Sequence, residues 1–406
     1  MKISPFVLEK INKPVLICVQ PTIKYFAWQV EVMLTNFKQL DLHQHFDIHI
    51  LFAYNDTLPT CENDISWGKS VEDKFAAVAQ FFYYNDTREK IVYISSVRPH
   101  LLKKHFKEFP GLSKKTIFYH DCDIVFTKFP DFILEKAQDD NKWYVSDTES
   151  YIGYNYIVSK GEDVLEKMCE IVGIHPELVK AKQKQSGGAQ YILKGVDWIF
   201  FDKMERDCEV LFSQINKLSS EKKALNPSYH ELQIWCADMW AMLWNGWLRG
   251  YDTEVIPEMD FCWATDPIEK YDEKYIFHNA GVTDNIKNEI FYKGDFRNKI
   301  PYTVPDTYDQ KKAGYKYFEI MRSISDMSLM VKEVYENLVS TFNEDALRTV
   351  TDDMRERSKV RLSFCVSCNL FENVNGKYRC NKCGCSTRAK VFLGTKEDCP
   401  ESKWSQ

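Results

Sequence analysis

The sequence predicts an α/β fold in which helices cover both faces of a mostly parallel β-sheet, with a small cysteine-rich module near the C-terminal end. Short apolar runs alternate with helix-length segments over the first two-thirds of the chain, the pattern of parallel strands joined by helices. Six of the 13 cysteines crowd into residues 365–406. With 406 residues, the chain is long enough for one large domain and an appendage. We expect a main domain at 1–310, a helical extension at 311–360 and a metal-binding module at 361–406.

The composition is that of a globular protein and excludes several classes of function. Aromatic residues make up 14% and charged residues 28% of the chain, unlike a disordered segment. The net charge of −6 provides no general basic field for nucleic acid, although a local basic surface is compatible with it. The sequence shows neither a signal-peptide pattern nor about 20 uncharged apolar residues in a row. We therefore expect no membrane span and a cytoplasmic location.

The elements follow in order from apolar periodicity and from breaker residues. Strands are expected at residues 14–20, 46–53, 91–96, 116–126, 143–145 and 275–277. Helices are expected at residues 29–40, 71–83, 162–172, 177–185, 198–217 and 233–244, with one or two more within 311–357. No Gly-x-Gly-x-x-Gly or Walker pattern occurs, which disfavours dinucleotide-binding and P-loop proteins.

The segment TIFYHDCDIVFTKFPDF, from Thr116 to Phe132, carries the main functional motif. Asp121 and Asp123 interrupt an apolar run that is otherwise typical of a buried strand, where carboxylates need compensation. Side chains alternate along a strand, so the two carboxylates face the same side and can hold one divalent cation. Mg²⁺ and Mn²⁺ bind one or two protein carboxylates together with phosphate oxygens, which suits a nucleotide diphosphate. The alternative is a turn at the strand end with two solvated acids.

Two motifs further along the chain can complete such a site. His278 follows a short apolar strand in the sequence HNAG, and imidazole is an acceptable Mn²⁺ ligand beside carboxylates, although a lone histidine is often structural. The segment SGGAQ, from Ser186 to Gln190, interrupts helical sequence at an expected helix start. Its glycines, Gly187 and Gly188, permit close approach of a ligand, and a helix N-terminus attracts anions. An ordinary flexible turn is the alternative.

The C-terminal cysteines have the spacing of a zinc ribbon, because two Cys-x₂-Cys pairs supply four thiolates for a tetrahedral Zn²⁺ site. The predicted ligands are Cys365, Cys368, Cys380 and Cys383. Cys385 and Cys399 can replace one of them, pair with each other or stay free. Since fewer than about 50 residues build too small a core, the metal would supply much of the folding free energy. A structural role is the default, and a modest local excess of positive charge permits docking on nucleic acid or an acidic partner.

The order of these motifs resembles that of the nucleotide-sugar glycosyltransferases of the GT-A fold: HDCD after a strand, then GGAQ, an acidic residue in a tryptophan-rich helix, and a closing HNAG. The resemblance covers about residues 12–310 and looks closest to virus-encoded members and to plant-type peptidyl-serine galactosyl or hydroxyproline arabinosyl enzymes. It implies that Asp121, Asp123 and His278 bind Mn²⁺ or Mg²⁺ on the donor diphosphate. The ending CPESKW resembles ribbons of phage-encoded proteins, which favours a viral origin and the host cytoplasm.

Further residues are assigned to the donor site by their position. Gln20 and Thr22 lie at the end of the first strand, where the resemblance places the nucleoside. Arg98 follows the third predicted strand, where it contacts the nucleotide or makes a surface salt bridge. The motif residues that complete the predicted donor site are His120, Gly187, Gly188, Gln190 and Asn279.

Asp238 is the first candidate for the catalytic group. Helix 233–244 is apolar all round except at this carboxylate, whose burial requires a partner or a function. Asp238 can be the general base of an inverting reaction, orient the donor sugar in a retaining one, or make a structural hydrogen bond. Asp147, which follows the predicted strand at 143–145, is the alternative candidate for the catalytic group. Most tryptophans of this region are core by helical spacing, and one or two can stack on a sugar; they are Trp235, Trp240, Trp244, Trp247 and Trp263.

We predict a metal-dependent glycosyltransferase, hexosyl or pentosyl, that moves a sugar from a nucleotide-diphosphate donor to a hydroxyl acceptor. Modified viral DNA, a virion protein and a glycan all stay open as acceptors. One alternative is a non-catalytic viral binding or assembly protein that works through its zinc ribbon. The other is a sugar nucleotidyltransferase, a class whose usual N-terminal glycine-rich signature this chain lacks.

Overall fold

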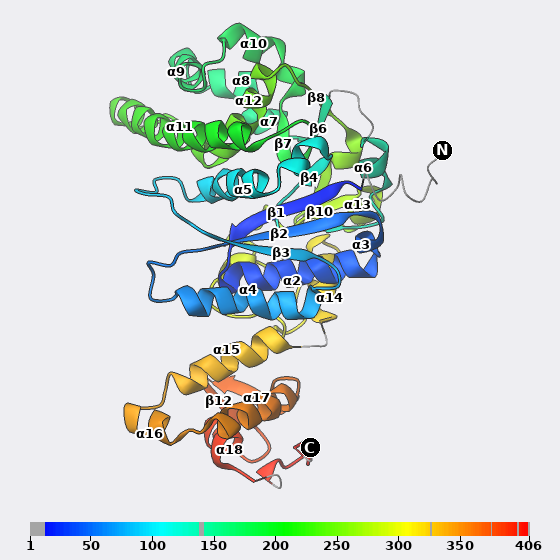
Figure 1. The fold of residues 1–406 in the computed structure, drawn as a ribbon, viewed down its shortest axis with the longest axis vertical. Helices are drawn as coiled ribbons and strands as arrows, with labels where there is room; N and C mark the ends of the chain where they lie inside the picture. Colours follow the sequence, from blue (N-terminus) through cyan, green and yellow to red (C-terminus); the bar gives the residue numbers. More distant parts are fainter. Residues whose placement is uncertain (1–12, 138–141, 325–326, 375, 396–397, 405–406) are drawn as a thin grey trace. The chain divides into compact units, whose positions relative to one another are not determined.

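The computed structural model describes residues 13–137, 142–324, 327–374, 376–395 and 398–404, which form two compact units (Figure 1). The first unit contains the described residues up to Lys293 together with Thr307–Phe318. The second contains Gly294–Asp306 and the described residues from Glu319 onward. The division into the ranges 1–310, 311–360 and 361–406 stays a prediction.

A seven-stranded sheet organises the first unit, with the strand order β3-β2-β1-β4-β7-β6-β8. Neighbouring strands run parallel from β3 to β4 and again between β6 and β8, whereas β7 is antiparallel to both of its neighbours. The prediction of a mostly parallel sheet is confirmed. The strands are β1 (Val15–Pro21), β2 (Asp47–Tyr54), β3 (Gln80–Asn85), β4 (Ile117–Tyr119), β6 (Lys142–Asp147), β7 (Gly187–Leu193) and β8 (Asp252–Val255).

Helices cover both faces of this sheet, with α2 and α4 on one face and α5 and α11 on the other (Figure 1). α12 is apolar almost all round because it is buried along nearly its whole length, in contact with both α11 and β7. The helices of the first unit are α2 (Lys24–Gln39), α3 (Leu42–His45), α4 (Cys61–Phe75), α5 (Val97–Glu108), α6 (Asp131–Glu135), α7 (Glu149–Ile152), α8 (Tyr154–Val158), α9 (Glu162–Val172), α10 (Pro176–Ala181), α11 (Trp198–Leu225), α12 (Ala237–Leu248) and α13 (Glu269–Glu273).

A second, three-stranded sheet brings distant motifs together. β10 (Ile276–His278) lies between β5 (Ile124–Phe126) and β9 (Phe261–Trp263). Its antiparallel register with β5 pairs His278 with Ile124. The end of the HNAG strand is thereby fixed directly beside the HDCD segment.

Two predicted elements near the sheet edge are wrong. The expected helix at 71–83 is the end of α4, which stops at Phe75, followed by the strand β3. The run QFFYYN is rich in aromatic residues that favour strands, and it pairs with β2. The expected strand at 91–96 is a loop and the short 3-10 helix Ile94–Ser96, which leads into α5. The hydrophobic periodicity of so short an apolar run does not distinguish a strand from a loop or a short helix. The sequence therefore could not show that 91–96 is not a strand.

Two predictions about the functional motifs are also wrong in their local structure. The segment 116–126 is not one strand, because β4 and β5 belong to different sheets and the acidic pair lies in the loop between them. The segment 186–190 does not start a helix. It enters the strand β7, so no helix N-terminus is available to an anion there.

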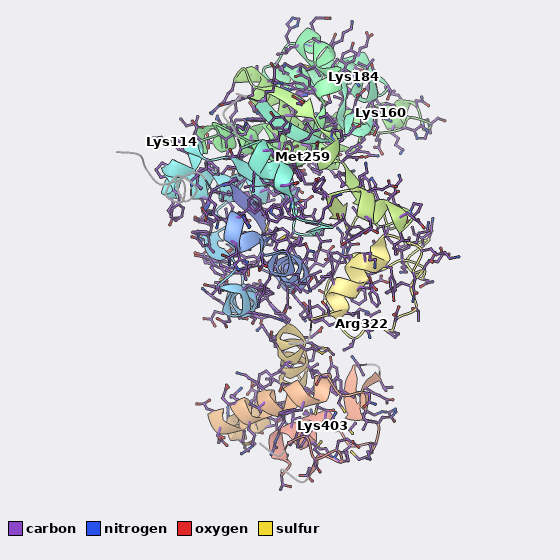
Figure 2. The ribbon with its side chains drawn as sticks, turned by 90° about the vertical axis from the view of Figure 1, so that its right-hand side faces the viewer. Lys114, Lys160, Lys184, Met259, Arg322 and Lys403 are labelled. Carbon is purple, nitrogen blue, oxygen red and sulfur yellow. The ribbon has the colours of Figure 1, made fainter. Side chains whose placement is uncertain are left out.

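The second unit consists mainly of helices and a hairpin. Arg322, the last residue of α14, and Lys403 mark parts of its chain in Figure 2. The sequence predicted one or two helices within 311–357, and the described residues there form three helices and the start of a fourth. No helix in the described part of the chain is long and apolar enough to cross a membrane. The elements are α14 (Gly314–Arg322), which begins in the first unit, α15 (Ser328–Val339), α16 (Glu344–Thr349), α17 (Asp352–Val366), β11 (Phe371–Val374), β12 (Lys377–Cys380) and α18 (Thr387–Leu393).

Candidate active site

The loop between β4 and β5 is held by backbone hydrogen bonds on both sides. The His120 N–H donates to the Ile17 carbonyl of β1 at 3.1 Å, and the Asn279 N–H donates to the Asp123 carbonyl at 2.9 Å. These bonds extend the pairing of both sheets into the loop. The side chains of the loop therefore have fixed positions relative to the end of β10.

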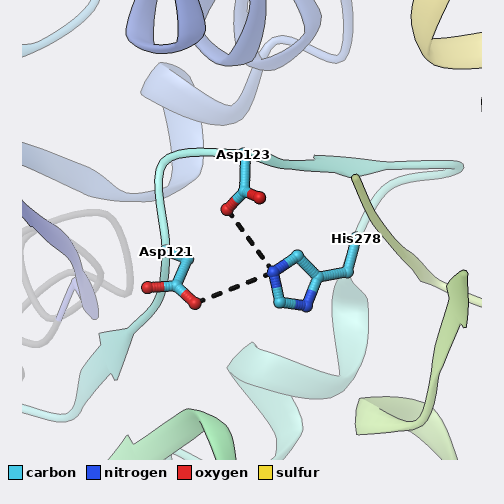
Figure 3. Close-up of side chains that lie close together, drawn as sticks. All are labelled: Asp121, Asp123 and His278. Atoms are coloured by element: carbon cyan, nitrogen blue, oxygen red, sulfur yellow. Dashed lines mark ion pairs between the residues drawn. The ribbon is translucent and has the colours of Figure 1, made fainter. Parts of the chain in front are cut away.

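Three side chains meet at this place, and they are the three predicted metal ligands. His278 Nε2 lies 3.4 Å from Asp123 Oδ1 and 3.7 Å from Asp121 Oδ2 (Figure 3). One ligand atom from each residue lies within 4.8 Å of the others. Two carboxylates and one imidazole form a donor set that suits Mn²⁺, and Mg²⁺ through the oxygens.

Lys293 is a further member of this cluster that the sequence analysis missed. Its Nζ forms an ion pair with Asp123 Oδ2. Burial would raise the pKa of Asp123, but Lys293 and His278 outweigh burial and hold this pKa below its ordinary range. Asp123 is therefore ionised at neutral pH, and its negative charge is paired with Lys293. Lys293 is the first residue of the short 3-10 helix Lys293–Phe296, and the sequence analysis assigned no element to this stretch.

Arg98 joins the acidic cluster to Asp238. It is the second residue of α5, and its guanidinium donates to Asp121 Oδ1 at 2.6 Å and to Asp238 Oδ2 at 3.0 Å. The Tyr93 hydroxyl donates to Asp238 Oδ1 at 2.6 Å. The burial of the Asp238 carboxylate is thus compensated by two donors, of which Tyr93 was not predicted because its segment was assigned to a strand.

These groups surround one cavity of about 370 Å³. Six of its charged or titratable lining residues are Arg98, Asp121, Asp123, Asp238, His278 and Lys293. Among the residues predicted to bind the nucleoside, Gln20 also lines the cavity. The structure therefore brings together the predicted metal ligands, the first catalytic candidate and two of the predicted donor residues.

Other predicted donor residues lie behind the wall of the cavity. Thr22 is buried and donates to the Asp64 carbonyl at 3.0 Å. His120 is buried beside Phe118, and burial lowers its pKa to about 4. Asn279 is buried and takes part through its backbone N–H.

The GGAQ residues have mainly packing contacts. A Cβ on Gly187 would clash with Val145, and one on Gly188 would lie 2.5 Å from the Tyr191 hydroxyl, so both positions require glycine for close packing. Gln190 is buried and accepts a hydrogen bond from Ser146 at 2.9 Å.

Asp147, the second catalytic candidate, is exposed at the end of β6. Its Oδ1 accepts from the Glu149 N–H at 3.1 Å. Its side chain is not among the residues that line the cavity.

The predicted zinc ligands lie in the second unit. Cys365, Cys368, Cys380 and Cys399 line one small cavity of about 40 Å³. Cys383 is exposed. Among the described residues, only the Asp121, Asp123 and His278 group brings three or more metal-ligating side chains within 4.8 Å of one another.

Comparisons with known proteins give distant structural neighbours. No family model matches the chain, and no curated protein matches its sequence. The apo structure of WbbM, a bifunctional glycosyltransferase, is 9% identical over 78% of this chain and 51% of that chain, with a TM-score of 0.42. The chain thus spans about half of the length of WbbM.

Two further neighbours are also glycosyltransferases. The galactosyltransferase LgtC, in complex with donor and acceptor sugar analogs, is 12% identical over 76% of this chain and 95% of that chain, with a TM-score of 0.38. GlyE of Streptococcus pneumoniae TIGR4 is 9% identical over 78% of this chain and 64% of that chain, with a TM-score of 0.32. The similarity is too distant to assign a family.

Proposed function

We propose that this chain is a metal-dependent glycosyltransferase of the GT-A type that transfers a sugar from a nucleotide-diphosphate donor to a hydroxyl acceptor. The carrying observation is the convergence of Asp121, Asp123 and His278 in one cavity with Arg98 and Asp238. This arrangement combines three ligands for a metal ion with two further groups. The Arg98 guanidinium can bind an anionic donor, and the Asp238 carboxylate can accept the proton of the acceptor hydroxyl.

The residues present fit a divalent metal ion. Asp123 is ionised, and the carboxylates and imidazole of the cluster are directed toward one another. Asp121, Asp123 and His278 would hold the ion, with Mn²⁺ favoured because imidazole accompanies the carboxylates. When bound, the metal would neutralise negative charge on the leaving diphosphate.

The protein's own groups account for the remaining tasks. Arg98 and Lys293 line the cavity on the acidic cluster and can bind diphosphate oxygens. Tyr93 and Arg98 fix the orientation of Asp238, which can accept the proton of an acceptor hydroxyl or orient the donor sugar. The position of Asp238 inside the cavity favours it over Asp147 as the catalytic residue.

Thermal denaturation with UDP-, GDP- and CMP-sugars tests this proposal. We expect one intact nucleotide sugar to stabilise the first unit only when Mn²⁺ or Mg²⁺ is present. Stabilisation by a nucleotide triphosphate and a sugar phosphate would instead indicate a nucleotidyltransferase. No response to any nucleotide would contradict a donor site and favour a binding protein.

For the second unit, we propose a structural Zn²⁺ bound by cysteine thiolates, as in a zinc ribbon. Support comes from the spacing of Cys365, Cys368, Cys380 and Cys383, and from the half-buried position of the first three around one small cavity. Cys399 lines the same cavity and is the alternative to Cys383 as the fourth zinc ligand.

Viral origin and a host cytoplasmic location remain part of the proposal, because the sequence motifs resemble those of virus-encoded proteins.

A further inference from the structure

The mouth of the active-site cavity carries large apolar side chains at exposed positions. Ile94, which was predicted to lie in a strand, is 78% exposed, and Trp235, just before α12, is 59% exposed. Both residues line the cavity. Exposed apolar groups forgo the free energy of burial, and their grouping at a polar cavity is typical of a binding surface.

The backbone of Trp235 and the carboxylate of Asp238 are linked through the Tyr93 hydroxyl. The Tyr93 hydroxyl that donates to Asp238 also lies 2.6 Å from the Trp235 carbonyl oxygen. The ring of Tyr151, another lining residue, is nearly parallel to that of Trp235, with an interplanar angle of 24° and centroids 6.4 Å apart. We call Ile94, Tyr151 and Trp235 the aromatic rim, after the two aromatic side chains among them.

We propose that the aromatic rim is an acceptor subsite that binds a saccharide, with one pyranose ring on the exposed face of Trp235. This inference rests on the proposed function, in which an acceptor hydroxyl must reach Asp238. A pyranose has C–H groups on its face and hydroxyls at its edge. It can therefore cover an aromatic ring and present a hydroxyl to a neighbouring carboxylate at the same time.

The charges around the cavity favour a neutral saccharide over nucleic acid as the acceptor. A phosphate backbone requires cations that face it. Arg98 contacts Asp121 and Asp238, and Lys293 contacts Asp123. Because these two basic residues of the described lining are assigned to the donor diphosphate, no further basic residue of that lining is left for a nucleic-acid acceptor. Three carboxylates thus accompany the two basic residues of the described lining.

Three of the other four tryptophans do not compete for this role, and Trp263, which also lines the cavity, is only partly exposed. Trp240, Trp244 and Trp247 lie in α12 and are buried in the core. Of the five tryptophans considered from the sequence, Trp235 alone has a largely exposed side chain.

The test measures binding of the full chain to an array of neutral oligosaccharides, with single-stranded DNA and Ser- or Thr-containing peptides as the other ligands. We expect saccharide binding that Trp235→Ala weakens about tenfold or more. Trp198→Ala is the matched control, because Trp198 is 40% exposed on α11 and does not line the cavity. Ile94→Ser provides a second rim variant with a smaller expected loss.

Stabilisation by nucleotide sugar and Mn²⁺ is measured on the same samples, so that the two proposals can fail separately. Loss of saccharide binding in Trp235→Ala with an unchanged donor response supports the subsite. Equal saccharide binding by the wild type and Trp235→Ala, or binding only to DNA or peptide, overturns it and leaves the donor site standing. If the wild type does not respond to any donor but binds saccharide through Trp235, the rim is a sugar site and the proposed transferase function is wrong.

Discussion

At the scale of single residues, the site could be predicted wherever a functional side chain belongs to a short motif at the end of a strand. Asp121, Asp123 and His278 have this property, and the register of β10 with β5 brings them together. Lys293 could not be found, because it lies in a single short 3-10 helix outside the recognised motifs and reaches Asp123 only through the tertiary fold. A sequence shows which residues are polar, but it does not show which residues they contact in the folded protein.

The metal ligands give the first prediction. Asp123→Ala and His278→Ala should each weaken Mn²⁺-dependent donor binding at least about tenfold. Each removes a protein ligand of the metal ion, and a water molecule in its place would bind the ion less well. Isothermal titration with Mn²⁺ and the stabilising nucleotide sugar measures this effect. Asp73→Ala, an exposed change on α4, is the control and should bind normally. Normal metal-dependent binding by Asp123→Ala would contradict the whole site.

Lys293 gives a prediction in which two affinities change in opposite directions. Lys293→Met removes the cation that pairs with Asp123, so Mn²⁺ alone should bind more tightly. Binding of the nucleotide diphosphate should weaken about tenfold, because a cation for its phosphates is lost. Lys287→Met, which changes a lysine outside the cavity lining, should alter neither affinity. Parallel weakening of both would show that Lys293 only maintains the fold of the loop.

Asp238 can be tested by a substitution that keeps its size. Asp238→Asn retains hydrogen-bonding atoms for Tyr93 but removes the charge that faces Arg98. Donor binding should survive, while the rate of sugar transfer falls about 100-fold or more if the carboxylate takes the acceptor proton. Steady-state kinetics and donor titration on one preparation separate these effects. Equal loss of donor binding would place Asp238 in the donor site.

At the scale of elements, the sequence predicted long periodic segments well and short apolar runs poorly. α9 has the predicted bounds, and α11 begins at the predicted residue. The run at 91–96 was predicted to be a strand, whereas Ile94 begins a short 3-10 helix and lies exposed at the cavity mouth. Function can require an apolar side chain to be exposed although folding alone favours its burial. Ile94, which belongs to the aromatic rim, is such a side chain.

The packing of β2, β3 and α5 has a consequence for pH. His49 Nδ1 lies 3.0 Å from His105 Nε2, and the Tyr84 hydroxyl lies 2.8 Å from His105 Nδ1 and donates to Glu108. This chain of donors and acceptors requires one proton on each imidazole. Burial, with Lys115, lowers the pKa of His49 to about 4, and burial, with His49, lowers that of His105 to about 3.

The first unit should therefore lose stability as the pH falls below about 6.5, the ordinary histidine value. Below that pH the unfolded chain binds protons that the folded chain refuses, which costs up to about 1.4 kcal/mol per pH unit for each histidine until its folded pKa is reached. Urea unfolding followed by tryptophan fluorescence at pH 7.5, 6.5 and 5.5 measures the slope. His49→Gln should reduce it, and an unchanged slope would show that other groups cause the acid sensitivity.

At the scale of the whole molecule, chemistry is divided between the two units. The lining residues of the active-site cavity belong to the first unit, whereas the C-terminal cysteines and Trp404 belong to the second. The parallel sheet could be predicted because alternation of elements is a property of the chain itself. The assignment of 294–306 to the second unit could not, because it depends on contacts made by residues from 319 onward, such as that of Glu333 with the Ile300 N–H.

This division predicts separate responses to loss of zinc. We expect about one Zn²⁺ per chain by elemental analysis, as a tetrahedral thiolate site implies. Cys365→Ser should release the metal and make the second unit sensitive to protease, with donor binding unchanged, whereas Cys61→Ser in the first unit should keep the zinc. Comparison of Cys383→Ser with Cys399→Ser identifies the fourth ligand, since only the true ligand releases zinc. An undamaged protein without zinc would contradict the ribbon, and loss of donor binding in Cys365→Ser would show that the two units are not functionally separate.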